Sequence, residues 1–133
     1  FIYRSRLNSY VVGTVLDSPL LDLGMVAVHE GKKRHLPALM ISFAKWIASR
    51  RFGIDWESLD YLTNASSFTQ PILLIHGDKD PVVPFSMSEQ LALMRPDIVT
   101  LIKLKGSTHV AGWNSHRNKY ESEIRSFLKR VGA

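Results

Sequence analysis

Residues 71–84 read Pro-Ile-Leu-Leu-Ile-His-Gly-Asp-Lys-Asp-Pro-Val-Val-Pro, and this stretch decides the fold class of the 133-residue chain. It opens with a run of four aliphatic residues, which is typical of a short strand buried on both faces of a parallel sheet. From His76 onward it is rich in glycine, aspartate and proline, which favour turns. We therefore predict a buried strand over residues 71–75 that leads directly into a polar loop.

The sequence before this strand predicts one further strand and two helical segments. Residues 10–16 are rich in β-branched side chains and are soon followed by Pro19, which suits a strand buried on both faces, and residues 1–7 resemble the last turns of a helix. A helix is predicted over residues 36–52, and a short helical piece over residues 55–62. The longer helix carries an apolar stripe at helical spacing, which we expect to pack in the core or in a lid: Leu36, Leu39, Met40, Phe43 and Ile47.

The sequence after residue 84 predicts two helices with a strand between them. A helix over residues 86–95 begins at a capping-box pattern, in which Glu89 lies three residues after Ser86. Residues 99–104 are predicted to form a strand, and the last helix is expected to start near residue 114. The last helix has its own apolar stripe, which we expect to be buried: Tyr120, Ile124, Phe127, Leu128 and Val131.

The alternation of strands and helices predicts an α/β fold with parallel strands joined by crossovers. We expect three layers, with a mostly parallel sheet of about three strands and helices flanking it. No internal repeat or low-complexity stretch divides the sequence, so residues 1–133 are expected to form a single domain. Within this domain we distinguish a helix tail and strand (1–19), a helical lid-like segment (20–70) and a region with the other two strands and the last helix (71–133).

Composition limits the classes of protein to which the chain can belong. A hydrophobic content of 45% with 22% charged residues is that of a globular domain, and the absence of cysteine excludes thiolate catalysis and thiolate zinc sites. The net charge of +5 comes from scattered cations without interleaved aromatic residues, which argues against nucleic-acid binding. The most apolar long stretch, residues 11–28, contains two aspartates and a proline. We therefore expect a soluble protein without a membrane span.

Three polar segments follow the predicted strands, at residues 17–18, 76–80 and 106–109. Ligand sites of open parallel sheets lie beyond the carboxyl ends of the strands, so these segments are expected to meet. A carboxylate and a histidine in such a place can act as orienter and general base, because the carboxylate fixes the imidazole tautomer and stabilises the imidazolium. His29 and His35 lack a spacing that suits shared metal ligation, and we expect neither a metal nor a cofactor.

The same residues carry a resemblance to a known family. The sequence from Gly77 to Pro84, followed by His109 in Gly-Ser-Thr-His, resembles the carboxyl-terminal half of an α/β-hydrolase fold protein. The resemblance implies that Asp80 is the catalytic acid and that His109 is the catalytic base. It also implies that residues 10–16 correspond to the sixth strand of the family fold.

The nucleophile of that family does not occur in this sequence. The family places a serine in a Gly-x-Ser-x-Gly elbow, ahead of the acid and the base in chain order, and no such motif is present in the 133 residues. We expect the nucleophile to lie upstream of Phe1 and the chain alone to be inactive. Ser18 and Ser107 lack the glycines of an elbow, so neither is expected to replace it.

Other roles stay open for the residues near the strand ends. Asp80 could cap the turn that follows it, and Asp78 is a weaker rival for the acid that suits hydrogen bonds to loop amides. His109 could be an ordinary exposed loop histidine. We expect His76 to pack or to hydrogen-bond locally, and we expect His116 to lie on the surface at the start of the last helix.

The resemblance implies a serine hydrolase that acts on an ester, amide or peptide bond. Residues 20–70 would then cap the site, with Phe43 and Trp46 lining an acyl pocket. Two alternatives are a related enzyme with an aspartate nucleophile and a non-catalytic α/β binding or scaffold module. As a partner beyond the substrate we expect a second copy, paired through the open edge of the strand at residues 10–16. The sequence leaves the compartment undecided.

Overall fold

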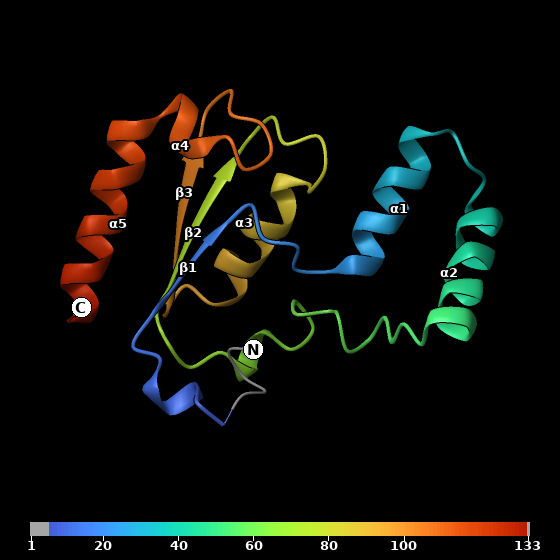
Figure 1. Ribbon diagram of the computed structural model, residues 1–133, viewed down its shortest axis with the longest axis horizontal. Helices are drawn as coiled ribbons and strands as arrows, with labels where there is room; N and C mark the ends of the chain where they lie inside the picture. Colours follow the sequence, from blue (N-terminus) through green and yellow to red (C-terminus); the bar gives the residue numbers. More distant parts are fainter. Residues whose placement is uncertain (1–5, 133) are drawn as a thin grey trace.

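A computed structural model describes residues 6–132, and its centre is a parallel three-stranded sheet (Figure 1). The strands β1 (Thr14–Asp17), β2 (Ile72–Gly77) and β3 (Val99–Leu104) lie in the order β1-β2-β3, and their first residues are in register. All three carboxyl ends therefore lie at the same edge of the sheet. The predicted parallel arrangement is confirmed.

Strand β2 is the buried centre of the molecule, and all six of its residues are buried. Ile72 and Leu74 belong to one apolar cluster, whereas Leu73 and Ile75 belong to a second one. Successive side chains of a strand point to opposite faces, so a run of four consecutive aliphatic residues supplies both clusters at once. The prediction of a strand buried on both faces is confirmed.

One helix covers each face of the sheet (Figure 1). Helix α3 (Phe85–Met94) places Met87 and Leu91 in the cluster that contains Ile72 and Leu74, and helix α5 (Arg117–Val131) places Phe127 in the other cluster. The core thus consists of two apolar layers, one on either side of the sheet. This arrangement confirms the predicted three-layer α/β architecture.

The helices α1 (Leu23–Lys33) and α2 (Ala38–Phe52) form an arm that lies to one side of the sheet (Figure 1). They pack against each other where α1 has a glycine. A Cβ atom on Gly31 would lie 2.5 Å from Cδ1 of Ile41, which is the buried side chain of α2. The arm is joined to the sheet by turns and by the 3₁₀ helix η2 (Ala65–Ser67).

The apolar stripe predicted for residues 36–52 is not a core stripe, which corrects our expectation. Ile41 is the one buried residue of α2 within the described chain, and Trp56 contacts the helix at Lys45 and Ser49, so most of the stripe stays exposed. An apolar stripe predicts which side chains share a helix face, and it does not show what covers that face. The stripe residues are each at least 40% exposed: Leu36, Leu39, Met40, Phe43 and Ile47.

The first strand is shorter and less buried than predicted for residues 10–16. Tyr10 ends a 3₁₀ helix, η1 (Asn8–Tyr10), and β1 begins only at Thr14, whose N–H donates to the carbonyl of Pro71. Proline has no N–H to donate, so pairing with the neighbouring strand cannot extend further in that direction. The residues of β1 itself are half-buried. The helix expected over residues 1–7 falls mostly outside the described residues.

Between the first two strands the structure differs from the prediction in two further places, and aspartate side chains that bond to nearby backbone explain both. Helix α1 was not predicted, although Asp22 caps it by accepting a hydrogen bond from the N–H of Met25 at 3.0 Å. Residues 55–62 form turns rather than a helix, because Asp55 and Asp60 each accept hydrogen bonds from residues three positions later. Aspartates that bond to nearby backbone favour turns and helix starts over helix interiors.

The predicted third strand at residues 99–104 is confirmed. The helices before and after this strand both start differently from the prediction. Helix α3 begins after Pro84 and has no side-chain cap, so the capping box expected at Ser86 does not form. The last helix is divided at His116 into a short α4 (Gly112–Ser115) and α5. The stripe on α5 packs against the sheet as expected, except that Leu128 is 39% exposed.

No helix within residues 6–132 combines the length and the hydropathy of a bilayer-spanning segment.

The two-sided burial of β2 predicts a large penalty for truncating it. Leu74→Ala, at a fully buried position, should lower the free energy of unfolding by about 2–5 kcal/mol, because it removes apolar contacts and leaves a cavity. Leu93→Ala makes the same chemical change at a side chain of α3 that is 81% exposed, and it should change stability by less than about 0.5 kcal/mol. Urea denaturation of both variants measures the difference; equal losses would contradict a core centred on β2.

Candidate active site

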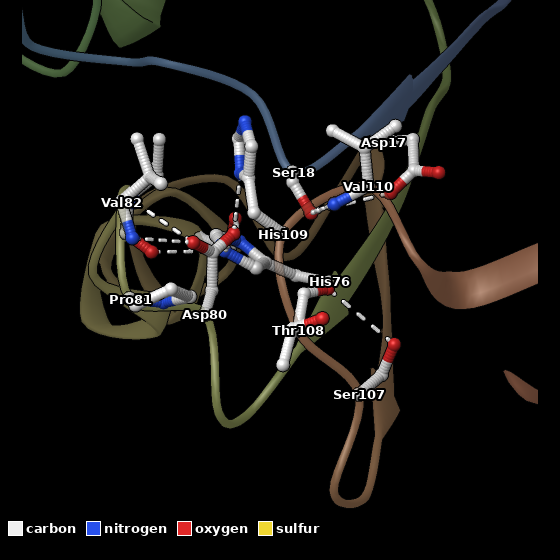
Figure 2. Close-up of polar contacts among 12 residues, drawn as sticks. Asp17, Ser18, His76, Asp80, Pro81, Val82, Ser107, Thr108, His109 and Val110 are labelled. Atoms are coloured by element: carbon white, nitrogen blue, oxygen red, sulfur yellow. Dashed lines mark hydrogen bonds and ion pairs between the residues drawn. The ribbon is translucent and has the colours of Figure 1, made fainter.

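The loops after the three strands converge at one edge of the sheet (Figure 2). The segments concerned are the end of β1 with Ser18, residues 78–84 after β2 and residues 105–111 after β3. The N–H of Val110 donates to Oγ of Ser18 at 3.4 Å, so the first and third loops touch. Residues far apart in the sequence thus share one site, as their position after parallel strands predicted.

Asp80 and His109 are in direct contact at this edge. Oδ2 of Asp80 lies 2.8 Å from Nδ1 of His109, and Figure 2 shows the imidazole standing over the carboxylate. The Asp80 side chain is fully buried, whereas that of His109 is 34% exposed. The predicted proximity of these two side chains is confirmed. Within the described residues Nε2 of His109 has no hydrogen-bond partner, so this nitrogen is available to a reacting group.

The two oxygens of Asp80 have different partners. Oδ1 accepts hydrogen bonds from the N–H groups of Val82 and Val83 at 2.8 and 2.9 Å, and Oδ2 faces His109. The turn-capping role and the contact with histidine, which the sequence analysis treated as alternatives, therefore occur together. Burial opposes ionisation of Asp80, but the hydrogen bonds from His109 and from the two valine amides outweigh it and hold the pKa of Asp80 below its ordinary value.

A second histidine touches the same carboxylate oxygen. His76, at the end of β2, is fully buried, and its Nε2 lies 3.2 Å from Oδ2 of Asp80 and 3.2 Å from the carbonyl oxygen of Val83. Its Nδ1 lies 2.7 Å from Oγ of Ser88 in helix α3. The expected local hydrogen bonding of His76 is confirmed. Sequence reasoning missed that its partner is Asp80, although a histidine four residues before the candidate acid was a usable signal.

A glycine allows the second and third loops to approach each other. A Cβ atom on Gly77 would lie 2.3 Å from the carbonyl oxygen of Ser107, which is too close for any other residue without a backbone shift. That carbonyl accepts a hydrogen bond from the N–H of Lys79, and Oδ1 of Asp78 accepts one from the N–H of Gly106 at 2.6 Å. Asp78 therefore bonds to a loop amide, as the sequence suggested, and joins the loops that carry Asp80 and His109.

The two serines near the site are buried. Ser18 and Ser107 are 5% and 1% exposed, and within the described residues neither hydroxyl is hydrogen-bonded to His109. The hydroxyl of Ser18 contacts Asp17 and the N–H of Val110, and that of Ser107 contacts the hydroxyl of Ser115. These contacts hold the loops in place, and they agree with the expectation that neither serine is a nucleophile.

Asp17 connects the first strand to the last helix. Its Oδ2 accepts a hydrogen bond at 3.1 Å from the hydroxyl of Tyr120 in α5. Burial and the negative charge of Asp17 raise the pKa of the Tyr120 phenol to about 12. At neutral pH the phenol therefore stays protonated and the contact is a stable donor–acceptor pair.

An open cleft of about 570 Å³ lies beside the loop that carries Asp80. Pro84 and Ser86 line it from the sheet side, and Met25 and Trp56 are among the residues that line it from the arm. The arm also reaches this loop directly, because Nζ of Lys33 donates to the carbonyl of Pro81 at 2.7 Å.

Two aromatic residues that were expected to line an acyl pocket do not line this cleft. Phe43 and Trp46 stack on each other with ring centres 5.7 Å apart, and they are 59% and 54% exposed. They lie on the uncovered face of α2, so the expectation of an acyl pocket at these residues is wrong for the described chain.

No group of three or more histidine, aspartate or glutamate side chains within residues 6–132 is arranged to hold a metal ion. The expectation that the protein binds neither a metal nor a cofactor stays a prediction.

Three solved structures resemble this fold. An esterase from Pyrococcus furiosus is 25% identical, with a TM-score of 0.60 over 91% of this chain and 45% of its own. An acylaminoacyl peptidase from Pyrococcus horikoshii is 17% identical, with a TM-score of 0.70 over 98% of this chain and 21% of its own. A puromycin-hydrolyzing peptidase from Mycobacterium tuberculosis is 22% identical, with a TM-score of 0.57 over 81% of this chain and 16% of its own. No family model matches the sequence, and no curated protein matches it significantly.

These likenesses define the class of fold. All three structures are α/β-hydrolase fold proteins, and the three parallel strands with their flanking helices match the carboxyl-terminal part of that fold. The chain therefore has an α/β-hydrolase fold, as the sequence resemblance implied. It spans less than half the length of each of these three structures.

The raised pKa of Tyr120 predicts a delayed ionisation that can be measured. Below pH 10 the Tyr120 phenol is neutral in both the folded and the unfolded chain, and its full contribution to the free energy of unfolding is present. Between about pH 10 and 12 the phenol ionises in the unfolded chain but not yet in the folded one, so this contribution is lost as the pH rises. Ultraviolet titration of the folded protein should show one of its four tyrosines ionising late, and Tyr120→Phe should remove that phase. Tyr10→Phe, at a side chain that is 80% exposed, should leave it unchanged. A wild-type protein that ionises in a single step while still folded contradicts the assignment.

Proposed function

We propose that residues 71–133 provide the catalytic acid and the catalytic base of a hydrolase, and that the complete protein cleaves ester, amide or peptide bonds. The observation that carries the proposal is the contact between Oδ2 of Asp80 and Nδ1 of His109, with Nε2 of the same ring left without a partner in the described chain. A buried carboxylate on one ring nitrogen and an accessible second nitrogen are what a general base in acyl transfer needs.

The proposed mechanism assigns one task to each side chain. His109 takes a proton through Nε2 from the attacking nucleophile and then returns it to the leaving group. Asp80 fixes the tautomer of the ring and stabilises the imidazolium, and its lowered pKa keeps it ionised while it does so. We propose a serine outside these 133 residues as the nucleophile, because the sequence contains no Gly-x-Ser-x-Gly motif.

The named activities of the similar structures support the reaction class. One is an esterase, and the others are an acylaminoacyl peptidase and a puromycin-hydrolyzing peptidase. Esters and amides are attacked at the same kind of carbonyl carbon by the same set of groups. We therefore propose a small-molecule or peptide substrate with an ester or amide bond.

We further propose that residues 20–70 act as a lid over the substrate site. The cleft beside the Asp80 loop is lined partly by Met25 and Trp56 of this segment, and Lys33 bonds to the carbonyl of Pro81. A substrate held there would contact the arm on one side and the acid loop on the other.

We also propose a homodimer paired through the outer edge of β1. Within the described residues β1 pairs only with β2, and the N–H groups of Thr14 and Ser18 both donate toward β2. Because alternate N–H groups of a strand point to opposite sides, those of Val15 and Asp17 point outward and remain available to a second copy.

The homodimer predicts a concentration-dependent mass and a matching pattern of amide protection. Sedimentation should detect a dimer at high protein concentration, and hydrogen exchange at Val15 and Asp17 should slow as the concentration rises. The N–H of Thr14, which bonds to Pro71 in each copy, is the internal control. A strict monomer, or a dimer that leaves Val15 and Asp17 in fast exchange, would show that this edge is not the interface.

The 133-residue chain by itself is expected to be inactive toward activated esters. Asp80 and His109 are in contact, but no serine in an elbow is present to be acylated. A p-nitrophenyl acyl ester assay and labelling with a fluorophosphonate test this expectation. Stoichiometric labelling of Ser18 or Ser107 would overturn the assignment of the nucleophile to a residue outside the chain.

In the complete protein, the proposed acid and base can each be tested by a substitution that is paired with the same substitution at a nearby residue of the same type. Asp80→Asn should lower kcat/KM by about 10³-fold or more, whereas Asp78→Asn should change it only slightly, because Asp78 bonds to a loop amide and not to His109. His109→Ala should be as severe as Asp80→Asn, and His116→Ala should leave most of the activity. Equal effects of Asp78→Asn and Asp80→Asn would contradict the assigned roles.

A further inference from the structure

We infer that His76 is a positioning residue for the Asp80–His109 pair, and that the two acceptors at its Nε2 hold the ring as the Nε2–H tautomer. The inference rests on the proposed function for its catalytic meaning, and it is carried by the contacts of a histidine to which the proposed mechanism gives no task. Figure 2 shows His76 beside the Asp80 carboxylate, on the side away from the exposed part of the His109 ring.

The tautomer of His76 follows from the atoms around the ring. Nε2 lies 3.2 Å from Oδ2 of Asp80 and 3.2 Å from the carbonyl oxygen of Val83, and both of these atoms are acceptors. A bare Nε2 would face two oxygens without a proton between them, so Nε2 carries the hydrogen. Nδ1 is then an acceptor, and the hydroxyl of Ser88 donates to it over 2.7 Å.

Burial makes this hydrogen-bond pattern obligatory. His76 and Ser88 are both fully buried, so water cannot replace a missing partner. The Phe85 and His76 rings pack edge to face, with 5.5 Å between their centres. The ammonium of Lys103, an exposed residue of β3, lies 4.7 Å from the centre of the Phe85 ring.

The carboxylate of Asp80 consequently receives four N–H donors. Two are the amides of Val82 and Val83 at Oδ1, and two are the ring nitrogens of His76 and His109 at Oδ2. A carboxylate has about four lone-pair sites, so none remains for a proton. The donors hold the group ionised and fix its rotation about the Cβ–Cγ bond. His76 thus acts on His109 through the oxygen that the two histidines share.

Removal of the His76 donor should strengthen the hydrogen bond between His109 and Asp80. A carboxylate oxygen with one donor fewer is a stronger acceptor, so Oδ2 of Asp80 attracts the Nδ1–H of His109 more strongly in His76→Phe. The Nδ1–H proton resonance of His109 should therefore move downfield in that variant.

The first test needs no substitution. Long-range ¹H–¹⁵N spectra of the wild-type chain at neutral pH should show His76 protonated at Nε2 and unprotonated at Nδ1. Ser88→Ala removes the donor to Nδ1 and should move the Nδ1 nitrogen resonance of His76, while the Nε2–H tautomer stays because both acceptors at Nε2 remain. Ser107→Ala, at a buried serine whose hydroxyl bonds to Ser115 and not to His76, should leave that resonance in place. An Nδ1–H tautomer in the wild type would overturn the inference, and so would identical spectra of Ser88→Ala and wild type.

The second test separates positioning from a merely structural role. His76→Gln places an amide donor near the position of Nε2 and should return the Nδ1–H resonance of His109 toward its wild-type position, whereas His76→Phe should not. His116→Gln, at the histidine that divides the last two helices, controls for the loss of a histidine elsewhere. An unchanged Nδ1–H resonance of His109 in a folded His76→Phe variant would overturn the inference; if that variant does not fold, the Ser88→Ala spectra still decide it.

These measurements are independent of hydrolase activity. A complete protein that cleaves no ester or amide would refute the proposed function and would leave the spectra of His76 as they are. If the complete protein is active, His76→Phe should lower kcat with little change in KM, and His76→Gln should restore part of the loss. A change in KM alone would contradict the positioning role.

Discussion

The rest of the structure depends on the burial of β2 on both faces. Four consecutive aliphatic side chains supply both apolar clusters, so α3 must cover one face and α5 the other. The same constraint places β1 and β3 on either side and leaves β2 in the centre. His76 ends this strand and is buried with it, which explains why a polar ring in the core has a partner on each nitrogen.

The candidate site is a direct consequence of that parallel sheet. Because the strands run in the same direction, the loops that follow them meet at one edge, and each brings a different kind of group. Gly77 permits the loops to touch, and Asp78 joins them through the N–H of Gly106. Asp80 and His109 are thereby held at hydrogen-bond distance by two loops that are rigidly connected to neighbouring strands.

The sequence was most informative where local chemistry and long-range packing require the same residues. The strand at residues 72–77, the third strand and the contact of Asp80 with His109 could all be predicted, because buried runs and strand-end loops have few alternatives. Helix α1 was missed because it depends on one aspartate cap in an otherwise weak pattern. The exposed stripe of α2 could not be predicted, because apolar periodicity does not show what covers a helix. The contact of His76 with the same oxygen of Asp80 was missed although the spacing of four residues between them was a usable signal.

The acid, the base and the second histidine all come from one continuous stretch of the chain. Residues 76–109 contain β2 from His76 onward, α3, β3 and both loops, and they supply the four N–H groups that face the carboxylate of Asp80. Within residues 6–132, neither β1 nor the arm donates a hydrogen bond to this carboxylate. The geometry of the pair is therefore set by the packing of α3 and β3 on β2, before any nucleophile is considered. A carboxylate that accepts four donors in this way keeps its charge and its orientation, and both are needed by a histidine that must repeatedly gain and lose a proton.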